Sequence, residues 1–384
     1  AANFNLCMGR KETEHAKSYV GNAVSMLAIL GVILCIAVQL FLHPMMILVG
    51  ATTDVLTYAC TYTRITSIGF PFLIVTIGGS NLIRADGSPN YSMACNLVGA
   101  VVNSILDPLF IFVFHMGMAG AALATITGQV LSFLLVVRYL RGFKTLPLSL
   151  SDLKPKTACW IQIASLGATP AFNQVAMMVV QIVMNNTLTH YGSNSIYGSD
   201  IPLACAGIIS KVNMLFFSFV IGISQGLQPI VSFNFGAAKY DRVKEAYKKA
   251  VFAATAISVV AFLCFQLFPR QIISIFGSGS EEYLHFAERY FRIFLFFTFL
   301  NGIQPVSSNF FTSIGAPKKG IFLSLTRQII FLLPLLLIFP YLFGIDGVMY
   351  TAPIADLAAA SVSIFMVVRE FKIMTELENR KAAA

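Results

Sequence analysis

The sequence contains an internal repeat, in which residues 9–50 recur in altered form 227 positions later. Identical residues at this shift are Gly9, Lys17, Ala23, Val24, Val32, Gln39, Leu40, Phe41 and Gly50, which match Gly236, Lys244, Ala250, Val251, Val259, Gln266, Leu267, Phe268 and Gly277. With a slip of one residue, Gly87-Ser88-Pro89 recurs as Gly315-Ala316-Pro317, and Gly117 and Gly120 recur at the original shift as Gly344 and Gly347. A repeat of this length means that the chain folds as two copies of one structural unit.

Both copies consist mainly of apolar stretches long enough to cross a membrane. Hydrophobic residues make up 57% of the chain and charged residues 11%, and several windows of about 20 residues hold no charge. The net charge of +9 reflects Lys and Arg in cytoplasmic loops rather than a nucleic-acid surface. The seven cysteines lie scattered in apolar segments without metal-ligand spacing, so we interpret them as small core residues. The composition predicts a membrane protein.

The hydrophobic pattern predicts ten membrane spans and the end of another at residues 1–8. The expected spans are 18–42, 56–83, 91–115, 118–140, 158–189, 203–233, 246–268, 284–312, 320–341 and 347–369. Two of them precede the second copy of the repeat, whereas only eight residues precede the first, so about 70 residues of the first copy are absent. We therefore expect twelve spans in the complete protein. Six spans per half give both copies the same orientation, as in transporters with parallel repeats.

The expected fold is an all-α polytopic membrane protein with two parallel six-helix lobes. Its predicted parts are an N-terminal lobe at 1–140, a cytoplasmic linker at 141–157, a C-terminal lobe at 158–370 and a cytoplasmic tail at 371–384. Basic residues concentrate in the linker, in the tail and in alternate loops. That side of the membrane is therefore predicted to be cytoplasmic, with the C-terminus on it.

Three motifs resemble those of the multidrug and toxic compound extrusion (MATE) family. They are Ile83-Arg84-Ala85-Asp86-Gly87-Ser88-Pro89, Asn103-Ser104-Ile105-Leu106-Asp107-Pro108 and Gly117-Met118-Ala119-Gly120-Ala121-Ala122-Leu123-Ala124-Thr125. The stretch from Gly222 to Ala237 is similar to a segment of the bacterial multidrug members. The resemblance implies secondary active efflux of amphipathic, mostly cationic compounds, driven by protons or sodium ions. It also implies two lobes around a central cavity in the cell membrane.

Asp107 is the strongest candidate for a functional side chain. An ionised carboxylate deep in an apolar span costs about 2.5–3.5 kcal/mol or more, so it is rarely present without a role. Asn103 lies one helical turn earlier on the same face. Thr125, on the next span, is as far from the intervening turn as Asp107 and should lie at equal depth. Pro108 cannot donate to the Ser104 carbonyl and should kink the helix.

These oxygens suit either sodium or a proton as the bound ion. The resemblance adds that family members place an Asn, an Asp and a Thr in a cation site of the first half, which Asn103, Asp107 and Thr125 match. The alternative is that Asp107 only holds two helices together. A further acid expected from the first helix of the family lies outside this chain. No cofactor other than the coupling ion is expected.

The second half has no acid equivalent to Asp107, because Pro334 or Leu335 occupies that position. Asp356 is the only carboxylate deep in this half. We expect it to pair with Lys211, either to stabilise the helix bundle or to handle protons or substrate. Arg327 is a weaker partner by depth, since it lies about six residues nearer the cytoplasm.

Polar and flexible side chains in the second half are candidates for a substrate cavity. Sodium-coupled members with acids in the second lobe carry a Glu in its first helix, where this chain has Asn173-Gln174. Methionine offers an adaptable wall for varied substrates, although it is also a common core filler. The candidates are Asn173, Gln174, Gln225, Gln304, Met177 and Met178. Each amide could instead make a helix-to-helix hydrogen bond.

Two other functions stay open at this point. A lipid-linked oligosaccharide flippase of the wider superfamily would share the repeats but should have a more cationic cavity. A channel is a weaker alternative, because it would not need a six-span parallel repeat with kinked helices. No nucleotide-binding loop or nucleophile with a base is visible, so an enzyme is not expected. The expected partners are membrane lipid and small drug-like molecules, with no nucleic acid, and the protein is expected to be a monomer.

Overall fold

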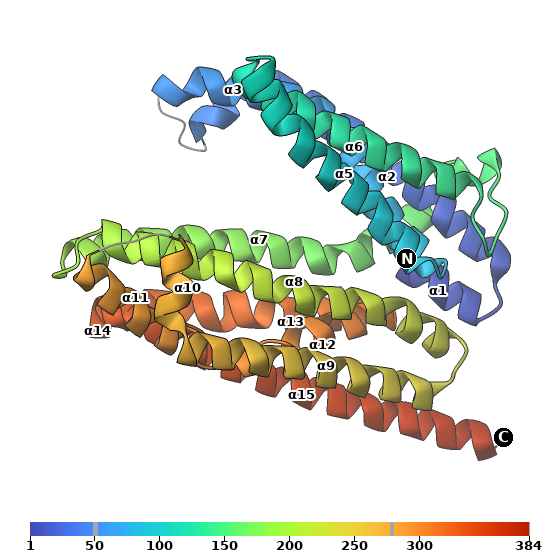
Figure 1. Ribbon diagram of the computed structural model, residues 1–384. Helices are drawn as coiled ribbons and strands as arrows, with labels where there is room; N and C mark the ends of the chain where they lie inside the picture. Colours follow the sequence, from blue (N-terminus) through green and yellow to red (C-terminus); the bar gives the residue numbers. More distant parts are fainter. Residues whose placement is uncertain (49–52, 277–279, 384) are drawn as a thin grey trace. The chain divides into compact units, whose positions relative to one another are not determined.

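The computed structural model describes residues 1–48, 53–276 and 280–383, so the repeat pair Gly50 and Gly277 lies outside the described residues. Figure 1 shows that the chain is built of helices, and the described ranges contain no strand. The chain divides into a first compact unit, Asn3–Ile163, and a second, Ala164–Ala384. The prediction of an all-α membrane protein is therefore confirmed.

Eight helices of the described ranges are long and apolar enough to span a membrane one by one. A ninth span is the pair Val55–Ile68 and Phe70–Ala85, which bends by 53° at a short break. The one remaining expected span, 284–312, differs from the prediction because it is broken into three short helical pieces. A hydrophobicity pattern reports how apolar a segment is, and it does not report where the helix breaks.

The first unit packs one long helix against a bent pair of helices and one helical hairpin. In chain order, its elements are α1 (Ala2–Gly9), α2 (Thr13–Leu48), α3 (Thr53–Ile68), α4 (Phe70–Ala85), α5 (Pro89–Pro108), the π-helix η1 (Leu109–Val113), α6 (Gly117–Arg141) and the 3₁₀ helix η2 (Leu150–Leu153). Helix α5 packs along α6 (Figure 1), and α2 packs along α4.

Two glycines allow α5 and α6 to approach each other closely. A methyl group on Gly99 would lie 2.8 Å from the Gly128 carbonyl oxygen, and one on Gly128 would lie 2.5 Å from the Gly99 carbonyl oxygen. Ser132 Oγ donates to the Cys95 carbonyl at 2.7 Å in the same contact. Small residues of this kind replace hydrophobic burial as the basis of helix packing in lipid. They fix the part of α5 and α6 from which Asn103 and Thr125 project.

The connection after α6 is fastened to the first unit by a buried carboxylate. Asp86 follows α4 and is 4% exposed. It accepts hydrogen bonds from Tyr139 Oη at 2.8 Å, from the Lys144 amide at 2.8 Å and from the Thr145 amide at 3.1 Å. Backbone and side-chain donors therefore satisfy the charge of Asp86, as a buried carboxylate requires.

The η2 helix of this connection packs directly against α2. A methyl group on Gly21 of α2 would lie 2.2 Å from the Asp152 carbonyl oxygen, so only glycine fits there. The start of η2 is closed by a capping box between Ser149 and Asp152. The hydrogen bond from the Ser149 amide lowers the pKa of the Asp152 carboxyl group. The basic, proline-containing connection is thus an ordered part of the first unit.

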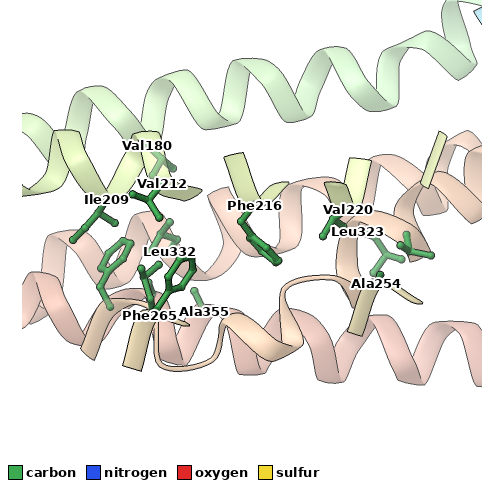
Figure 2. Close-up of a cluster of buried hydrophobic side chains, with 14 of the residues drawn as sticks. Val180, Ile209, Val212, Phe216, Val220, Ala254, Phe265, Leu323, Leu332 and Ala355 are labelled. Atoms are coloured by element: carbon green, nitrogen blue, oxygen red, sulfur yellow. The ribbon is translucent and has the colours of Figure 1, made fainter. Parts of the chain in front are cut away.

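The second unit contains the longer helices of the chain. In chain order, its elements are α7 (Thr157–Ser193), which begins in the first unit, α8 (Asp200–Gly236), α9 (Tyr240–Leu267), α10 (Pro269–Phe276), α11 (Glu281–Phe294), η3 (Thr298–Leu300), α12 (Ile303–Ser313), α13 (Pro317–Leu325), the π-helix η4 (Thr326–Leu332), α14 (Leu333–Phe343) and α15 (Ile345–Ala383). Figure 2 shows part of its core, in which Val220 of α8, Ala254 of α9 and Leu323 of α13 are fully buried.

The backbone repeats the sequence duplication in detail. Gly87 and its counterpart Gly315 have φ angles of 80° and 79°, a region that favours glycine because it has no Cβ. Lys11 and its counterpart Ala238 also have positive φ angles, of 64° and 54°. These pairs confirm that the chain contains two copies of one structural unit.

The same glutamine stabilises a helix break in each copy. In the first copy, Gln39 Nε2 donates to the Arg64 carbonyl oxygen at 2.7 Å, shortly before the α3–α4 break at Gly69. In the second, Gln266 Nε2 donates to the Arg292 carbonyl oxygen at 2.9 Å, shortly before the end of α11. The Arg292 carbonyl is one of the last four of α11, which have no helical donor, so Gln266 replaces a hydrogen bond that lipid cannot supply. The Arg64 carbonyl is the fifth from the end of α3 and also accepts from Ser67 Oγ at 3.0 Å, so Gln39 adds a contact beside the break.

The close α5–α6 contact predicts that Gly128→Ala destabilises the fold. The added methyl group would meet backbone rather than a movable side chain, and overpacking of this kind costs about 1–3 kcal/mol. The matched control is Gly207→Ala in α8, where nothing lies within 4 Å and alanine should be neutral or favourable. Thermal unfolding in detergent should show a lower melting temperature for Gly128→Ala alone. Equal melting temperatures for the two variants would contradict the close contact.

Candidate functional site

Asn103 of α5 and Thr125 of α6 meet in the first unit, whereas the sequence analysis placed Thr125 level with Asp107. Asn103 Nδ2 donates to Thr125 Oγ1 in a long hydrogen bond of 3.4 Å, and both side chains are half-buried. Thr125 Oγ1 itself donates to the Ala121 carbonyl at 3.0 Å. The Asn103 Oδ1 and Thr125 Oγ1 oxygens can still accept a further hydrogen bond or bind a cation.

Asp107 lies one turn beyond Asn103 and is half-buried. Its Oδ1 atom is shielded from solvent and has no hydrogen-bond partner. Buried polar atoms are nearly always paired, so an unpaired carboxylate oxygen is unusual and suggests an ion or proton as its partner. The structure gives no direct hydrogen bond between Asp107 and the Asn103–Thr125 pair.

The backbone next to Asp107 is irregular, as Pro108 led us to expect. Pro108 has no N–H to offer the Ser104 carbonyl. The Leu109 amide donates to Leu106, three residues back, rather than four residues back. The π-helix η1 begins immediately afterwards, and π-helical turns often occur at functional sites. The distortion places carbonyl oxygens without their usual donors beside the carboxylate.

A second unpaired acceptor lies on α6, and the sequence analysis did not identify it. Gln129 Oε1 is buried without a hydrogen-bond partner, one turn after Thr125. It lies against Gly69 at the α3–α4 break, where an added methyl group would be 2.0 Å away. The sequence did contain a signal for this residue, because Gln129 lies one helical turn after Thr125 and therefore on the same face of α6.

The first unit therefore offers oxygen ligands of the type that a hard cation prefers. They are a carboxylate, amides, a hydroxyl and backbone carbonyls. The described residues contain no group of three or more His, Cys, Asp or Glu side chains that could hold a metal. A sodium ion would thus depend on Asp107 for charge and on neutral oxygens for the remaining ligands. The carboxylate alone suffices for a proton.

In the second unit, Asp356 pairs with Arg327, and the predicted pair with Lys211 is wrong. Arg327 Nε donates to Asp356 Oδ1 at 2.6 Å, and the two side chains are 13% and 1% exposed. Asn301 also lies within interacting range of this carboxylate, whereas Oδ2 has no hydrogen bond of ordinary geometry. Lys211 is exposed on α8.

The error arose from counting residues along ideal helices. Six residues correspond to about 9 Å of helix axis, which seemed too far for Arg327 to reach Asp356. The π-helix η4, Thr326–Leu332, begins beside Arg327 and changes both the rise and the facing of the following turns. The long arginine side chain spans the remaining distance. Estimating the depth of a residue from its position along an ideal helix is therefore wrong where the helix contains a π-helical segment.

The predicted cavity residues divide into two groups. Four lie along one exposed part of α7: Asn173, Gln174, Met177 and Met178. Asn173 Nδ2 contacts Met177 Sδ at 3.8 Å. Gln304 is buried, and its Nε2 donates to the Leu323 carbonyl at 2.6 Å, so it ties α12 to α13. Gln225 is half-buried and also has an interaction partner.

The long apolar helices, the duplicated units and the unpaired carboxylate within a span define a polytopic membrane transporter. The sequence profile of the MatE family matches residues 6–109 and 170–338, which is most of the chain. The chain belongs to the MatE family.

Multidrug export proteins from two staphylococci are similar to this chain in sequence. The multidrug export protein MepA of Staphylococcus haemolyticus (strain JCSC1435) is 26% identical over 358 residues, which cover 92% of this chain and 77% of MepA. MepA of Staphylococcus aureus (strain MSSA476) is 24% identical over 339 residues, covering 88% and 73%. Both relatives are described as export proteins rather than enzymes.

Solved structures share the fold. An outward-facing multidrug resistance MATE family transporter of the MOP superfamily has a TM-score of 0.90 at 20% identity, covering 98% of this chain and 83% of the other. A MOP superfamily transporter from Pyrococcus furiosus has a TM-score of 0.90 at 21% identity, covering 97% and 83%. The latter is described as having a binding pocket of reverse polarity that suggests a different function.

The buried Arg327–Asp356 pair predicts unequal effects of single and double substitutions. Arg327→Leu leaves Asp356 buried without its partner, which should cost about 3–5 kcal/mol of stability. The double variant Arg327→Leu/Asp356→Leu should be milder, because no charge remains unpaired. Lys211→Leu is the control and should behave as wild type. Melting temperatures in detergent test the set, and equal losses in single and double variants would contradict the pair.

Proposed function

We propose that the chain is an ion-coupled exporter of amphipathic, mostly cationic compounds. Membership of the MatE family and the similarity to MepA, a multidrug export protein, support export of this kind. The observation on which the proposal depends is the buried Oδ1 atom of Asp107, which lacks a hydrogen-bond partner in an apolar span. Uphill export needs a group that is loaded differently in the inward-facing and outward-facing states.

Asp107 would carry the proton or sodium ion, and Asn103 and Thr125 would orient it. In the ion-free state, the carboxylate is negative and attracts a cationic substrate. Loading the ion neutralises the carboxylate, so substrate binding weakens while the unit can adopt its other state. Each ligand can shift the equilibrium only by its difference in affinity for the two states. The carbonyls beside Pro108 would supply further oxygens if the ion is sodium.

The proposal includes a location and an orientation. The protein would lie in the plasma membrane as a monomer, with lipid around it and its C-terminus in the cytoplasm. Lysines and arginines at the start of α9 and on the final part of α15 support this orientation, since cytoplasmic segments carry excess positive charge. The exposed part of α7 with Met177 and Met178 offers an adaptable surface for substrates of different shapes.

Asp107→Asn should abolish gradient-driven efflux while leaving the protein folded. Asparagine keeps the size of the side chain but cannot take up a proton or neutralise a cation. Inverted vesicles energised with a proton or a sodium gradient should lose uphill dye transport, whereas dye binding to the purified protein persists. Asp200→Asn, at the exposed start of α8, is a matched control and should transport as wild type. Undiminished uphill efflux by Asp107→Asn would reject Asp107 as the coupling group.

Thr125→Ala should distinguish sodium from proton coupling. Removing its hydroxyl takes away one candidate oxygen ligand, which matters to a coordinated sodium ion and much less to a proton held by Asp107. If sodium drives transport, the sodium concentration for half-maximal efflux should rise about tenfold, as expected for a loss of about 1.4 kcal/mol. If protons drive it, the rate should change little. Ser104→Ala, on the exposed side of α5, serves as the control.

A further inference from the structure

A hollow of about 430 Å³ lies between the final part of α2 and the helix α3. It lies within the first unit, and its lining combines basic, hydroxyl and apolar side chains. Lining residues include His43, Leu56, Thr57, Thr61, Arg64 and Ile65. Thr57, Thr61 and Arg64 follow one another at helical spacing, so one face of α3 presents two hydroxyls and a guanidinium to the hollow.

Arg64 is exposed and makes no ion pair with any carboxylate of the described residues. It lies eleven residues after the start of α3, in the bent α3–α4 pair that is long and apolar enough to span a membrane. An arginine in such a span needs a counter-charge or water. Its carbonyl is occupied by Gln39, but its guanidinium has no such partner in this part of the structure.

The second copy of the repeat shows what a neutralised version of this position looks like. Arg292 corresponds to Arg64, because Gln266 and Gln39 bind the two carbonyls in the same way. Arg292 Nη2 lies 2.8 Å from Glu288 Oε1, one turn earlier on α11. In the first copy, the residue one turn before Arg64 is Cys60, which also lines the hollow.

His43, the other basic side chain of the hollow, also differs from its counterpart in ion pairing. His43 corresponds to Arg270 at the repeat shift of 227 residues. Arg270 Nη2 is bonded to both carboxylate oxygens of Glu281 at 3.0 Å. His43 forms no ion pair with the described residues. The copy in the second unit is therefore neutralised internally, whereas the copy in the first unit keeps a positive charge beside an open volume.

We propose that this hollow, the Arg64 site, binds the phosphate or carboxylate group of an amphipathic anion. The planar guanidinium of Arg64 recognises such a group through paired hydrogen bonds. His43 and the Thr57 hydroxyl supply further donors, whereas Thr61 Oγ1 already donates to the Thr57 carbonyl at 2.9 Å. Leu56 and Ile65 contact the apolar part of the ligand. The ligand is either an anionic lipid with its headgroup in the hollow or a soluble amphipathic acid. The Arg64 site is separate from the proposed coupling group Asp107 and does not rest on it.

The test measures binding directly, with no transport step. Native mass spectrometry of the purified chain in a neutral detergent would be titrated with phosphatidylglycerol in one arm and with dodecanoate in the other. Wild type should bind at least one of them about tenfold or more tightly than Arg64→Gln does, since the variant loses a charge-assisted contact. Binding of only phosphatidylglycerol identifies a lipid ligand, and binding of only dodecanoate identifies a soluble acid.

Two further variants use the comparison between the copies. Cys60→Glu adds the acid that Arg292 has in Glu288, so it should abolish binding while Arg64 remains. Arg292→Gln is the matched control and should bind as wild type. Circular dichroism and gel filtration check that each variant is folded. Absence of binding to wild type, equal binding by Arg64→Gln, or full binding by Cys60→Glu would each overturn the proposal. Asp107→Asn should bind the anion normally, so a failure of the coupling proposal can be told apart from a failure of the Arg64 site.

Discussion

A helix can break inside a membrane only where another group satisfies the backbone that the break leaves unpaired, since lipid offers no donors. Gln266 does this in the second copy, by donating to the Arg292 carbonyl near the end of α11, and Gln39 makes the equivalent contact with the Arg64 carbonyl in the first. The bent α3–α4 span and the broken span that begins with α11 both contain this contact. The breaks divide what would be straight spans into shorter elements.

The backbone is duplicated, but the charges are not. Asp107 in the first copy corresponds to Pro334 or Leu335, so only one copy has a carboxylate there. Arg64 has no ion-pair partner among the described residues, where Arg292 is neutralised by Glu288. The second unit instead buries the Arg327–Asp356 pair. Since structural repetition satisfies packing in both units, these differences in charge are the positions where we propose functions specific to the first unit.

The sequence was sufficient for the helical class and the duplication, because these follow from hydrophobic pattern and repeat shift. Equal depth placed Thr125 beside Asp107, whereas the structure pairs Thr125 with Asn103, one turn earlier on α5. The sequence was insufficient where helices depart from ideal geometry. The span at 284–312 breaks because of local backbone contacts that hydrophobicity does not record. Arg327 was discounted because the π-helix η4 was not foreseen. The boundaries predicted at 141–157 and 371–384, and the parallel orientation of the halves, stay predictions.

Competition between ion and substrate for one carboxylate is the central claim, and linkage makes it measurable without transport. If both depend on Asp107, raising the proton or sodium concentration must weaken substrate binding by the same factor that substrate weakens ion binding. The decisive measurement is the Kd of a fluorescent cationic substrate as a function of pH and of sodium, for wild type and for Asp107→Asn. The account predicts a Kd that rises about tenfold or more with the coupling ion in wild type and stays constant in the variant. The same ion dependence in both proteins would contradict it.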